Sequence, residues 1–360
     1  MASSEEMAMQ RVMTEPGTTG GTWRRIRRWL KPAWNALAGA IIGSTLLAGG
    51  IQPAAAQGSM PQIWMAATEP VWREVHGWGQ NDYIDLFQHG APWQQALRHV
   101  QVFQFSKRFI EQSSPETLSH VISFLNRHGI AIAMQGTPNL ATRGCGRGIE
   151  SYGSPPDMGR DAAKIRHLGG QVSYITMDEP LFFGHLYNSH GGRIACHSPI
   201  ETIAADAAQK IAEARRVFPS VQVGETEPYG IPFVSAQSWA TMLAQWFSAF
   251  RNATGQPLAF EHADIVWNRP GALSQFEAAV PAIRQAGIPL GIIYNGTPQD
   301  PTSAAWVADA HRHVALIEKR LAIHPAHAIF QSWTERPRHM MPDTAADTLT
   351  GLIRSYVADH

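Results

Sequence analysis

The sequence predicts an α/β fold, a single (β/α)8 barrel of the TIM type over residues 61–360, preceded by an N-terminal signal segment. Beyond residue 60, short apolar runs alternate with segments of 3.6-residue periodicity, and this alternation indicates a parallel sheet. Eight such units follow one another without a linker, which favours a closed barrel over an open doubly wound sheet. No Gly-x-Gly-x-x-Gly follows the first strand and no phosphate loop is present, which argues against a nucleotide-binding fold.

The predicted strands are short and rich in β-branched, aromatic and aliphatic residues, as expected of strands that are covered on both faces. Polar or Gly/Pro-rich residues follow each of them and mark the loops. In chain order the predicted strands are residues 63–67, 100–105, 130–135, 172–177, 221–224, 258–263, 290–293 and 328–331.

A helix is predicted after each strand. The second has a clear start signal, because Ser113 or Ser114 precedes Pro115 in the first turn and Glu116 follows. The loop before the third helix, residues 136–156, is long and rich in glycine. The other predicted helices are residues 93–98, 157–168, 199–217, 235–252, 273–286, 302–321 and 344–358.

The charge balance gives no indication of a polyanionic partner. Lys plus Arg and Asp plus Glu number 29 each, so no net charge attracts the chain to nucleic acid or to an anionic membrane surface. The chain has 12 Trp and 7 Tyr, flat amphipathic side chains that suit sugar rings but also an ordinary core. We therefore predict no nucleic-acid partner, and composition alone does not identify the ligand.

The first 56 residues have the features of an export signal. Residues 23–31 are basic, residues 33–51 are almost wholly apolar and small, and Ala54 and Ala56 supply the small residues before a cleavage site. We predict cleavage after about Ala56 and a secreted or periplasmic protein. The alternative is an uncleaved anchor, because the apolar run is just long enough to span a bilayer, and only then would the protein contact a membrane.

The chain has only two cysteines, Cys145 and Cys196, and both lie in Gly-rich predicted loops. An oxidising compartment outside the cytoplasm favours bridging them. No further Cys lies at metal-ligand spacing, so we predict one disulfide and no metal site at these residues.

Residues 171–180 form the most informative stretch, a predicted buried strand that ends in Asp178 and Glu179. Pro180 cannot continue a strand ladder. Two carboxylates at the end of a central strand are costly unless they are hydrated, paired or hydrogen-bonded. We interpret them as functional; the alternative is that both are loop carboxylates facing water.

Polar residues just past the strand ends are the candidates for an active site, because the loops after the strands of such a barrel build it. A structural explanation would require an Arg partner for each acid, and we expect about half of the acids to be structural in that way. The candidates are Glu69, Lys107, Arg108, Gln135, Asn139, Asp178, Glu179, Glu225, Glu227, Glu261, His262, Asp264, Tyr294, Asn295, Trp333 and Glu335.

Paired carboxylates with aromatic neighbours suit cleavage of a glycosidic bond. One acid with a raised pKa protonates the leaving oxygen, and a carboxylate stabilises or attacks the oxocarbenium centre. Flat side chains could stack on the sugar, although core packing is the alternative for each ring taken alone. The aromatic candidates for this role are Trp64, Trp72, Tyr229, Tyr294 and Trp333.

Over residues 61–360 the pattern resembles the (β/α)8 glycoside hydrolases. Asp178-Glu179-Pro180 is similar to the Asn-Glu-Pro after strand four of the clan A glycosidases, which implies that Glu179 is the acid/base. Ser332-Trp333, after the eighth predicted strand, resembles the segment of that clan whose Trp forms the base of the sugar-binding subsite. The chain departs from the clan where its nucleophile Glu should follow strand seven, because Tyr294-Asn295-Gly296 stands there.

Two arrangements could replace the missing nucleophile. A second carboxylate could come from strand five or six, with Glu225, Glu227 or Asp264 as base or nucleophile. Alternatively the substrate could supply its own nucleophile, which resembles β-hexosaminidases and chitinase-like barrels with an adjacent Asp-Glu, a Tyr and a Trp around the sugar.

Two other functions remain open. In a metal-dependent barrel similar to xylose isomerase, Glu179, Glu225 or Glu227, His262 and Asp264 would converge as ligands, although no His-x-His or His-Glu-x-x-His motif supports this. In the other alternative the barrel is exported and binds carbohydrate without catalysis. We predict a carbohydrate substrate, no cofactor and no metal.

Overall fold

The computed structural model describes residues 60–67, 69–71, 82–189 and 191–360. The predicted signal segment, residues 1–56, and Trp72 lie outside the described residues. Within the described part of the chain, no helix is both long and apolar enough to cross a membrane.

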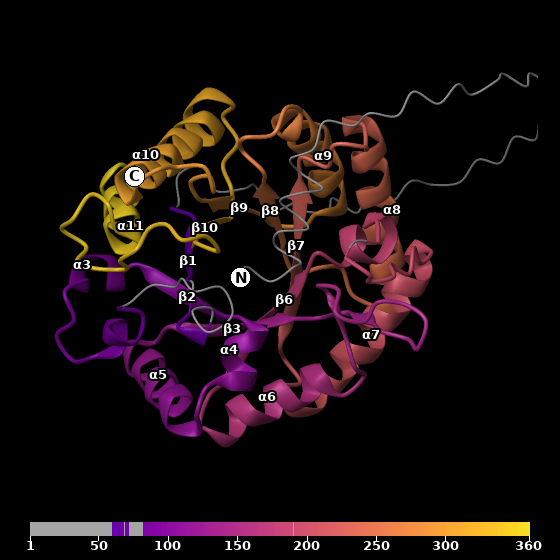
Figure 1. The fold of residues 1–360 in the computed structure, drawn as a ribbon, viewed down its shortest axis with the longest axis horizontal. Coiled ribbons are helices and arrows are strands. Elements are labelled where there is room, and N and C mark those ends of the chain that lie inside the picture. The colour runs from indigo at the N-terminus through magenta and orange to yellow at the C-terminus, as the bar shows by residue number, and fades with distance from the viewer. Residues whose placement is uncertain (1–59, 68, 72–81, 190) are drawn as a thin grey trace, which may run out of the picture. The chain divides into compact units, whose positions relative to one another are not determined.

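The described residues form a closed barrel of eight parallel strands, which confirms the predicted fold (Figure 1). Strand β1 pairs with β2 on one side and with β10 on the other, which closes the sheet. Around the barrel the strands are β1 (Gln62–Ala66), β2 (Val100–Phe105), β3 (Ala131–Gly136), β6 (Val172–Asp178), β7 (Gln222–Tyr229), β8 (Glu261–Ile265), β9 (Leu290–Tyr294) and β10 (His327–Gln331).

Helices surround the strands as an outer ring (Figure 1). Hydroxyl side chains begin several of them: Ser114, as predicted, accepts from the N–H of Thr117, and Thr302 accepts from the N–H of Ala305. The helices are η1 (Ile84–Phe87), α3 (Gln94–Leu97), α4 (Lys107–Gln112), α5 (Pro115–His128), α6 (Asp157–His167), η2 (Phe182–Leu186), α7 (Ile200–Val217), α8 (Ala236–Thr254), α9 (Ala272–Ala286), α10 (Ser303–Val314), η3 (Ala315–Arg320) and α11 (Leu349–Ala358).

Apolar side chains fill the barrel interior, separate from the larger core between sheet and helices. This interior cluster consists of Trp64, Val102, Ala133, Phe260, Ile293 and Ile329. Side chains alternate across a strand, so residues two or four positions further along face the interior again, nearer the carboxyl ends. On β1 this position is Ala66, and on the other strands of the cluster it is polar: Gln104, Gln135, Asp264, Asn295 and Gln331. The barrel interior is therefore largely apolar, apart from the paired His262 and His327, and lies beneath a mostly polar mouth.

The structure differs from the predicted elements at β7 and near the chain end. Strand β7 runs to Tyr229 rather than ending at residue 224, because its ladder with β8 continues from Glu225 to Tyr229. Helix α11 begins at Leu349 rather than at residue 344, because Thr348 caps it by accepting from the N–H of Gly351. The long loop after β3 contains the strands β4 (Asn139–Leu140) and β5 (Tyr152–Gly153), which were not predicted.

Candidate active site

Strand β6 ends at Asp178, and Glu179 turns the chain out of the barrel. Glu179 has φ of 47°, in the left-handed region, which costs about 1–3 kcal/mol for a non-glycine residue. Its N–H donates to the carbonyl of Thr226 on β7 at 2.9 Å, so the neighbouring strand holds the turn. Such strain at the end of a central strand is typical of functional sites.

Glu179 is a buried acid. It is 5% exposed, and its Oε2 is buried with no hydrogen-bond partner among the described residues. Burial raises its pKa well above the usual range, and the charges of Glu150, Asp178, Asp264 and Glu227 raise it further. Both effects favour the protonated form of the carboxyl group, and one of its oxygens is free for another molecule.

Asp178 and Asp264 lie beside Glu179 on the interior face. Burial raises the pKa of Asp178, and hydrogen bonds to Gln135 and Glu150 partly offset that rise. Burial and the charge of Asp178 raise the pKa of Asp264 to about 7. Because these groups influence one another electrostatically, we call Glu150, Asp178, Glu179 and Asp264 the mouth cluster.

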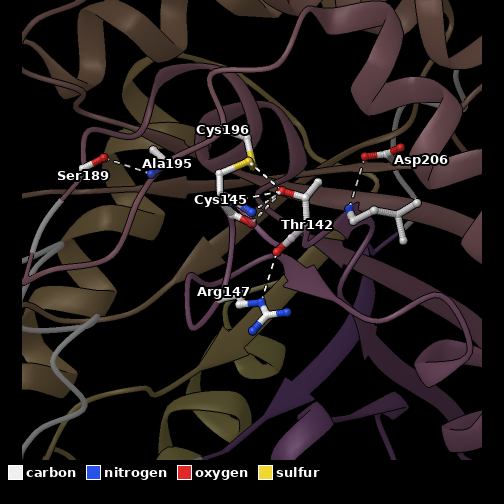
Figure 2. Close-up of a disulfide and its surroundings, with 9 residues drawn as sticks. Thr142, Cys145, Arg147, Ser189, Ala195, Cys196 and Asp206 are labelled. Carbon is white, nitrogen blue, oxygen red and sulfur yellow. Dashed lines mark hydrogen bonds between the residues drawn. A yellow bond between two sulfur atoms is a disulfide. The ribbon is translucent and has the colours of Figure 1, made fainter.

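Sequence reasoning missed Glu150, which lies in the Gly-rich loop of residues 136–156. This loop is tied to the loop after β6 by a disulfide between Cys145 and Cys196, which confirms the predicted bridge (Figure 2). The N–H of Gly146 also donates to the carbonyl of Ile194 at 2.8 Å. The available signal was an acid in a long loop after a barrel strand, five positions beyond a bridged cysteine.

A cavity of about 290 Å³ opens beside the mouth cluster, between α4, the end of β3 and the disulfide-linked loop. Lys107, Gln135, Glu150 and Asp178 all line it, so two of the predicted binding residues meet two carboxyls of the cluster. The backbone N–H of Lys107 donates to Oε1 of Gln135 at 3.3 Å. This contact fixes the start of α4 to the end of β3.

Glu225 lies away from the mouth, which corrects the prediction that it sits at a strand end. Both of its carboxyl oxygens accept from Nε1 of Trp246 on α8, at 2.7 and 2.6 Å. Glu225 also hydrogen-bonds Glu261 on β8, and Oε1 of Glu261 accepts from the Tyr229 hydroxyl at 3.1 Å. Odd-numbered residues of β7 face the helices, so these side chains form an outer cluster.

Two other predicted acids bind backbone N–H groups. Glu227 accepts from the N–H of Leu181 at 2.6 Å and of Phe182 at 3.1 Å, in the segment that follows Glu179. Glu69 is buried and accepts from the N–H of Ser106 at 2.9 Å. In these contacts both acids hold loop backbone in place.

The structure places three predicted sugar-binding aromatics in the core. Trp64 has no exposed surface, packs on Tyr174 inside the barrel and donates its Nε1 to Oε1 of Gln62 at 2.9 Å. Tyr229 is buried, with its hydroxyl on Glu261, and the Tyr294 hydroxyl donates to Glu318 at 2.6 Å. Tyr229 and Tyr294 face the helices because the strands run past the positions where the sequence indicated that they end.

Three further predicted residues, His262, Asn295 and Glu335, occupy different environments. Nε2 of His262 lies inside the barrel, 3.0 Å from Nδ1 of His327. Burial is the larger cause, and the charge of His327 the smaller cause, of a pKa of His262 well below the usual range. Oδ1 of Asn295 accepts from Nε1 of Trp267 at 2.8 Å. Glu335 is an exposed loop residue, and hydrogen bonds to its Arg336 and Arg338 partners lower its pKa.

Trp333 lies in the loop that follows the carboxyl end of β10, two positions beyond Gln331, the last residue of that strand. The residue is half-buried, and its Nε1 is buried without a hydrogen-bond partner among the described residues.

The ligand set of the metal-dependent alternative does not converge. Glu225 faces α8, His262 is paired with His327 inside the barrel, and only Glu179 and Asp264 are at the mouth. Across the described ranges, no three His, Cys, Asp or Glu side chains are grouped to hold a metal ion.

Comparison with known proteins supports the fold. No family model matches the chain. No curated protein matches it either. A psychrophilic glycoside hydrolase family 10 endo-β-1,4-xylanase is similar in structure, with a TM-score of 0.50, 11% identity, and coverage of 82% of this chain and 96% of that one.

Two further solved structures are similar over most of their length. A GH10 endoxylanase retrieved from a sugarcane soil metagenome has a TM-score of 0.46 and 11% identity, with coverage of 83% of this chain and 97% of that one. D-psicose 3-epimerase in the presence of D-fructose has a TM-score of 0.44 and 11% identity, with coverage of 83% and 98%. At 11% identity the likeness to the psychrophilic xylanase extends to the fold and no further.

Proposed function

We propose that this protein is an exported glycoside hydrolase in which Glu179 is the general acid. The observation that carries the proposal is the buried carboxyl group of Glu179, which has an oxygen without a partner among the described residues and interacts electrostatically with four further carboxyl groups. A carboxylic acid with a raised pKa, next to a second carboxyl group, is what glycosidic cleavage requires.

In the proposed reaction Glu179 donates its proton to the glycosidic oxygen as the bond from that oxygen to the anomeric carbon breaks. The leaving sugar departs as an alcohol, and positive charge develops at the anomeric carbon and ring oxygen. Negative charge on Asp178 stabilises that centre. Water then adds to the anomeric carbon and loses a proton to a carboxylate.

Asp264 is the proposed acceptor of that proton. Of the three acids considered from sequence, Glu225 binds Trp246 on α8. Glu227 and Asp264 both interact electrostatically with Asp178 and Glu179, but both carboxyl oxygens of Glu227 accept from backbone N–H groups. With a pKa of about 7, Asp264 can accept a proton near neutral pH. A substrate-assisted mechanism is less favoured, because the Tyr294 hydroxyl that it would use donates to Glu318.

The sequence of the first 56 residues and the disulfide between Cys145 and Cys196 support export as part of the proposal. The expected partner is a poly- or oligosaccharide outside the cytoplasm. A non-catalytic carbohydrate-binding barrel is the second candidate, because the strand-seven Glu of clan A is replaced by Tyr294-Asn295-Gly296.

The test is release of reducing sugar from a panel of polysaccharides and aryl glycosides by the purified protein. Glu179→Gln should abolish release while sugar binding persists. Glu225→Gln, a buried acid outside the mouth, is the matched control and should retain turnover. Sugar binding without turnover in the wild type would support the second candidate instead.

A further inference from the structure

The cavity beside the mouth cluster contains groups that the proposed chemistry does not use. Its walls come from the start of α4, the end of β3 and the loop segment of residues 148–152. The Thr137 hydroxyl on this wall already donates to Asp157 and accepts from Lys210. Gln112 lies at the edge of the cavity on α4, and Ser106 and Ser151 also line it. These side chains offer hydroxyl and amide groups that can both donate and accept hydrogen bonds.

The charged groups of the cavity wall have partners within the protein. Nζ of Lys107 pairs with Glu111 and lies 3.7 Å from Asp157 and 3.6 Å from Asp161. Asp178 hydrogen-bonds Glu150 and Gln135. Arg108 on the same wall also has an interaction partner. These charged side chains therefore interact with other protein groups, and an anionic or cationic ligand would have to compete with those interactions.

The cavity is also small and preformed. Its volume of about 290 Å³ is at the lower limit of small-molecule sites, which span roughly 300–1,000 Å³. This size suits one sugar ring. Gly146, with φ of 81°, lets Tyr152 close the loop, since a Cβ there would come within 2.5 Å of the Tyr152 ring. The disulfide at the neighbouring Cys145 holds the same loop, so the wall does not have to form on binding.

We propose that this cavity is a subsite that holds one uncharged sugar ring of the substrate beside the mouth cluster. The proposal rests on the proposed function and adds the substrate class, a neutral glycan. The ring hydroxyls exchange hydrogen bonds with the amide and hydroxyl groups of the wall, and the next glycosidic bond along the chain reaches Asp178 and Glu179.

The test measures binding, by isothermal titration calorimetry, to the full chain carrying Glu179→Gln. The neutral probes are xylotetraose, cellotetraose, maltotetraose and laminaritetraose. The charged probes are tetragalacturonate, which is anionic, and the glucosamine tetramer, which is cationic. Gln112→Trp fills the cavity from its exposed edge, and Gln285→Trp on an exposed position of α9 is the matched control.

We expect at least one neutral tetrasaccharide to bind more tightly than both charged probes. Gln112→Trp should weaken it by about tenfold, the equivalent of 1.4 kcal/mol, whereas Gln285→Trp should leave it unchanged. Gln112→Ala, which requires no repacking, should weaken it by a smaller factor. Tighter binding of a charged probe, equal affinity in the Gln112 and Gln285 variants, or no binding of any probe would overturn the proposal.

Hydrolysis of the same probes separates this proposal from the proposed function. If the wild type binds a neutral tetrasaccharide in a manner sensitive to Gln112→Trp but hydrolyses none, the subsite stands and the hydrolase fails. If hydrolysis occurs with unchanged KM in Gln112→Trp, the hydrolase stands and the subsite fails.

Discussion

The barrel holds two groups of buried carboxyls on neighbouring strands, and they differ in what surrounds their oxygens. The mouth cluster includes Glu179 and Asp264, and the outer cluster includes Glu225 and Glu261. Burial is the largest cause of a raised pKa in both groups. A raised pKa is therefore common to both and does not identify a catalytic acid.

Position in the barrel separates the two groups. Glu225 accepts twice from Trp246, Glu261 accepts from Tyr229, and the two acids bond to each other. Oε2 of Glu261 and Oε2 of Glu179 are both buried without a hydrogen-bond partner among the described residues. Glu261 lies on a strand and faces the helices, whereas Glu179 lies just past the end of β6, so only the free oxygen of Glu179 is placed for a substrate.

The largest expected difference between the two groups is in turnover. Glu179→Gln should lower kcat by roughly 10²–10⁴-fold, because the amide cannot protonate a leaving oxygen. Initial rates on the best substrate check this, and circular dichroism shows whether the variant is folded. Glu225→Gln should keep kcat within about twofold of wild type, since its group is outside the mouth. A larger loss in Glu225→Gln than in Glu179→Gln would reverse the assignment of the two clusters.

The second difference is in stability. Glu225→Ala should lower the free energy of unfolding by about 1–3 kcal/mol, because the buried N–H of Trp246 loses its acceptor. Urea unfolding monitored by tryptophan fluorescence measures it. Glu335→Ala is the control, because Glu335 is exposed and its pairs with Arg336 and Arg338 contribute little. Equal loss in both variants would mean that the outer cluster does not stabilise the fold.

Most of the fold could be predicted from sequence, because apolar runs and helical periodicity are local signals. The end of β7 could not, because Glu225 and Glu227 look like loop acids until the ladder with β8 shows that the strand continues. Side chains of β7 alternate between its two faces, and this alternation continues through the residues beyond 224. The odd-numbered acids Glu225 and Glu227 therefore face the helices. Asp178, Glu179 and Asp264 were placed correctly at strand ends, but their contacts depend on neighbours far away in sequence.

Partners of the structural acids were also beyond sequence reasoning. We expected arginines to pair with them, and this holds for Glu335. Glu225 instead binds an indole, Glu227 binds backbone N–H groups and Glu318 binds two tyrosines. Every residue except proline carries a backbone N–H, and tryptophans and tyrosines add side-chain donors, so composition cannot reveal which acids these donors satisfy.

Glu150 provides a further test of the difference between the two clusters, because its negative charge acts on the mouth cluster alone. The pKa of Glu179 is raised first by burial and then by Glu150. Activity should fall as pH rises through that pKa, since the acid must be protonated. Glu150→Gln removes the charge, eases ionisation of Glu179 and should move the alkaline limb of kcat to lower pH, by about 0.5–1 unit.

The control for this pH experiment is Glu335→Gln. Glu335 is exposed in the loop after β10, so removing its charge should leave the alkaline limb of kcat unchanged. Removing the disulfide by Cys145→Ser with Cys196→Ser should act in the same direction as Glu150→Gln, because the loop that carries Glu150 is released. A shift to higher pH in Glu150→Gln would show that Glu150 does not raise the pKa of Glu179.

The smallest expected effect distinguishes two tryptophans, one in the loop after β10 and one inside the barrel. Trp333 is half-buried and has an Nε1 without a partner among the described residues, whereas Trp64 is fully buried with its Nε1 on Gln62. If Trp333 stacks on a sugar, Trp333→Phe should raise KM by roughly two- to tenfold, the equivalent of about 0.5–1.5 kcal/mol for ring contacts. Trp64→Phe should instead lower the melting temperature and leave KM unchanged, because its ring touches only the interior. Steady-state kinetics with thermal melts on both variants decide this, and a KM effect in Trp64→Phe without one in Trp333→Phe would exclude Trp333 from the binding surface.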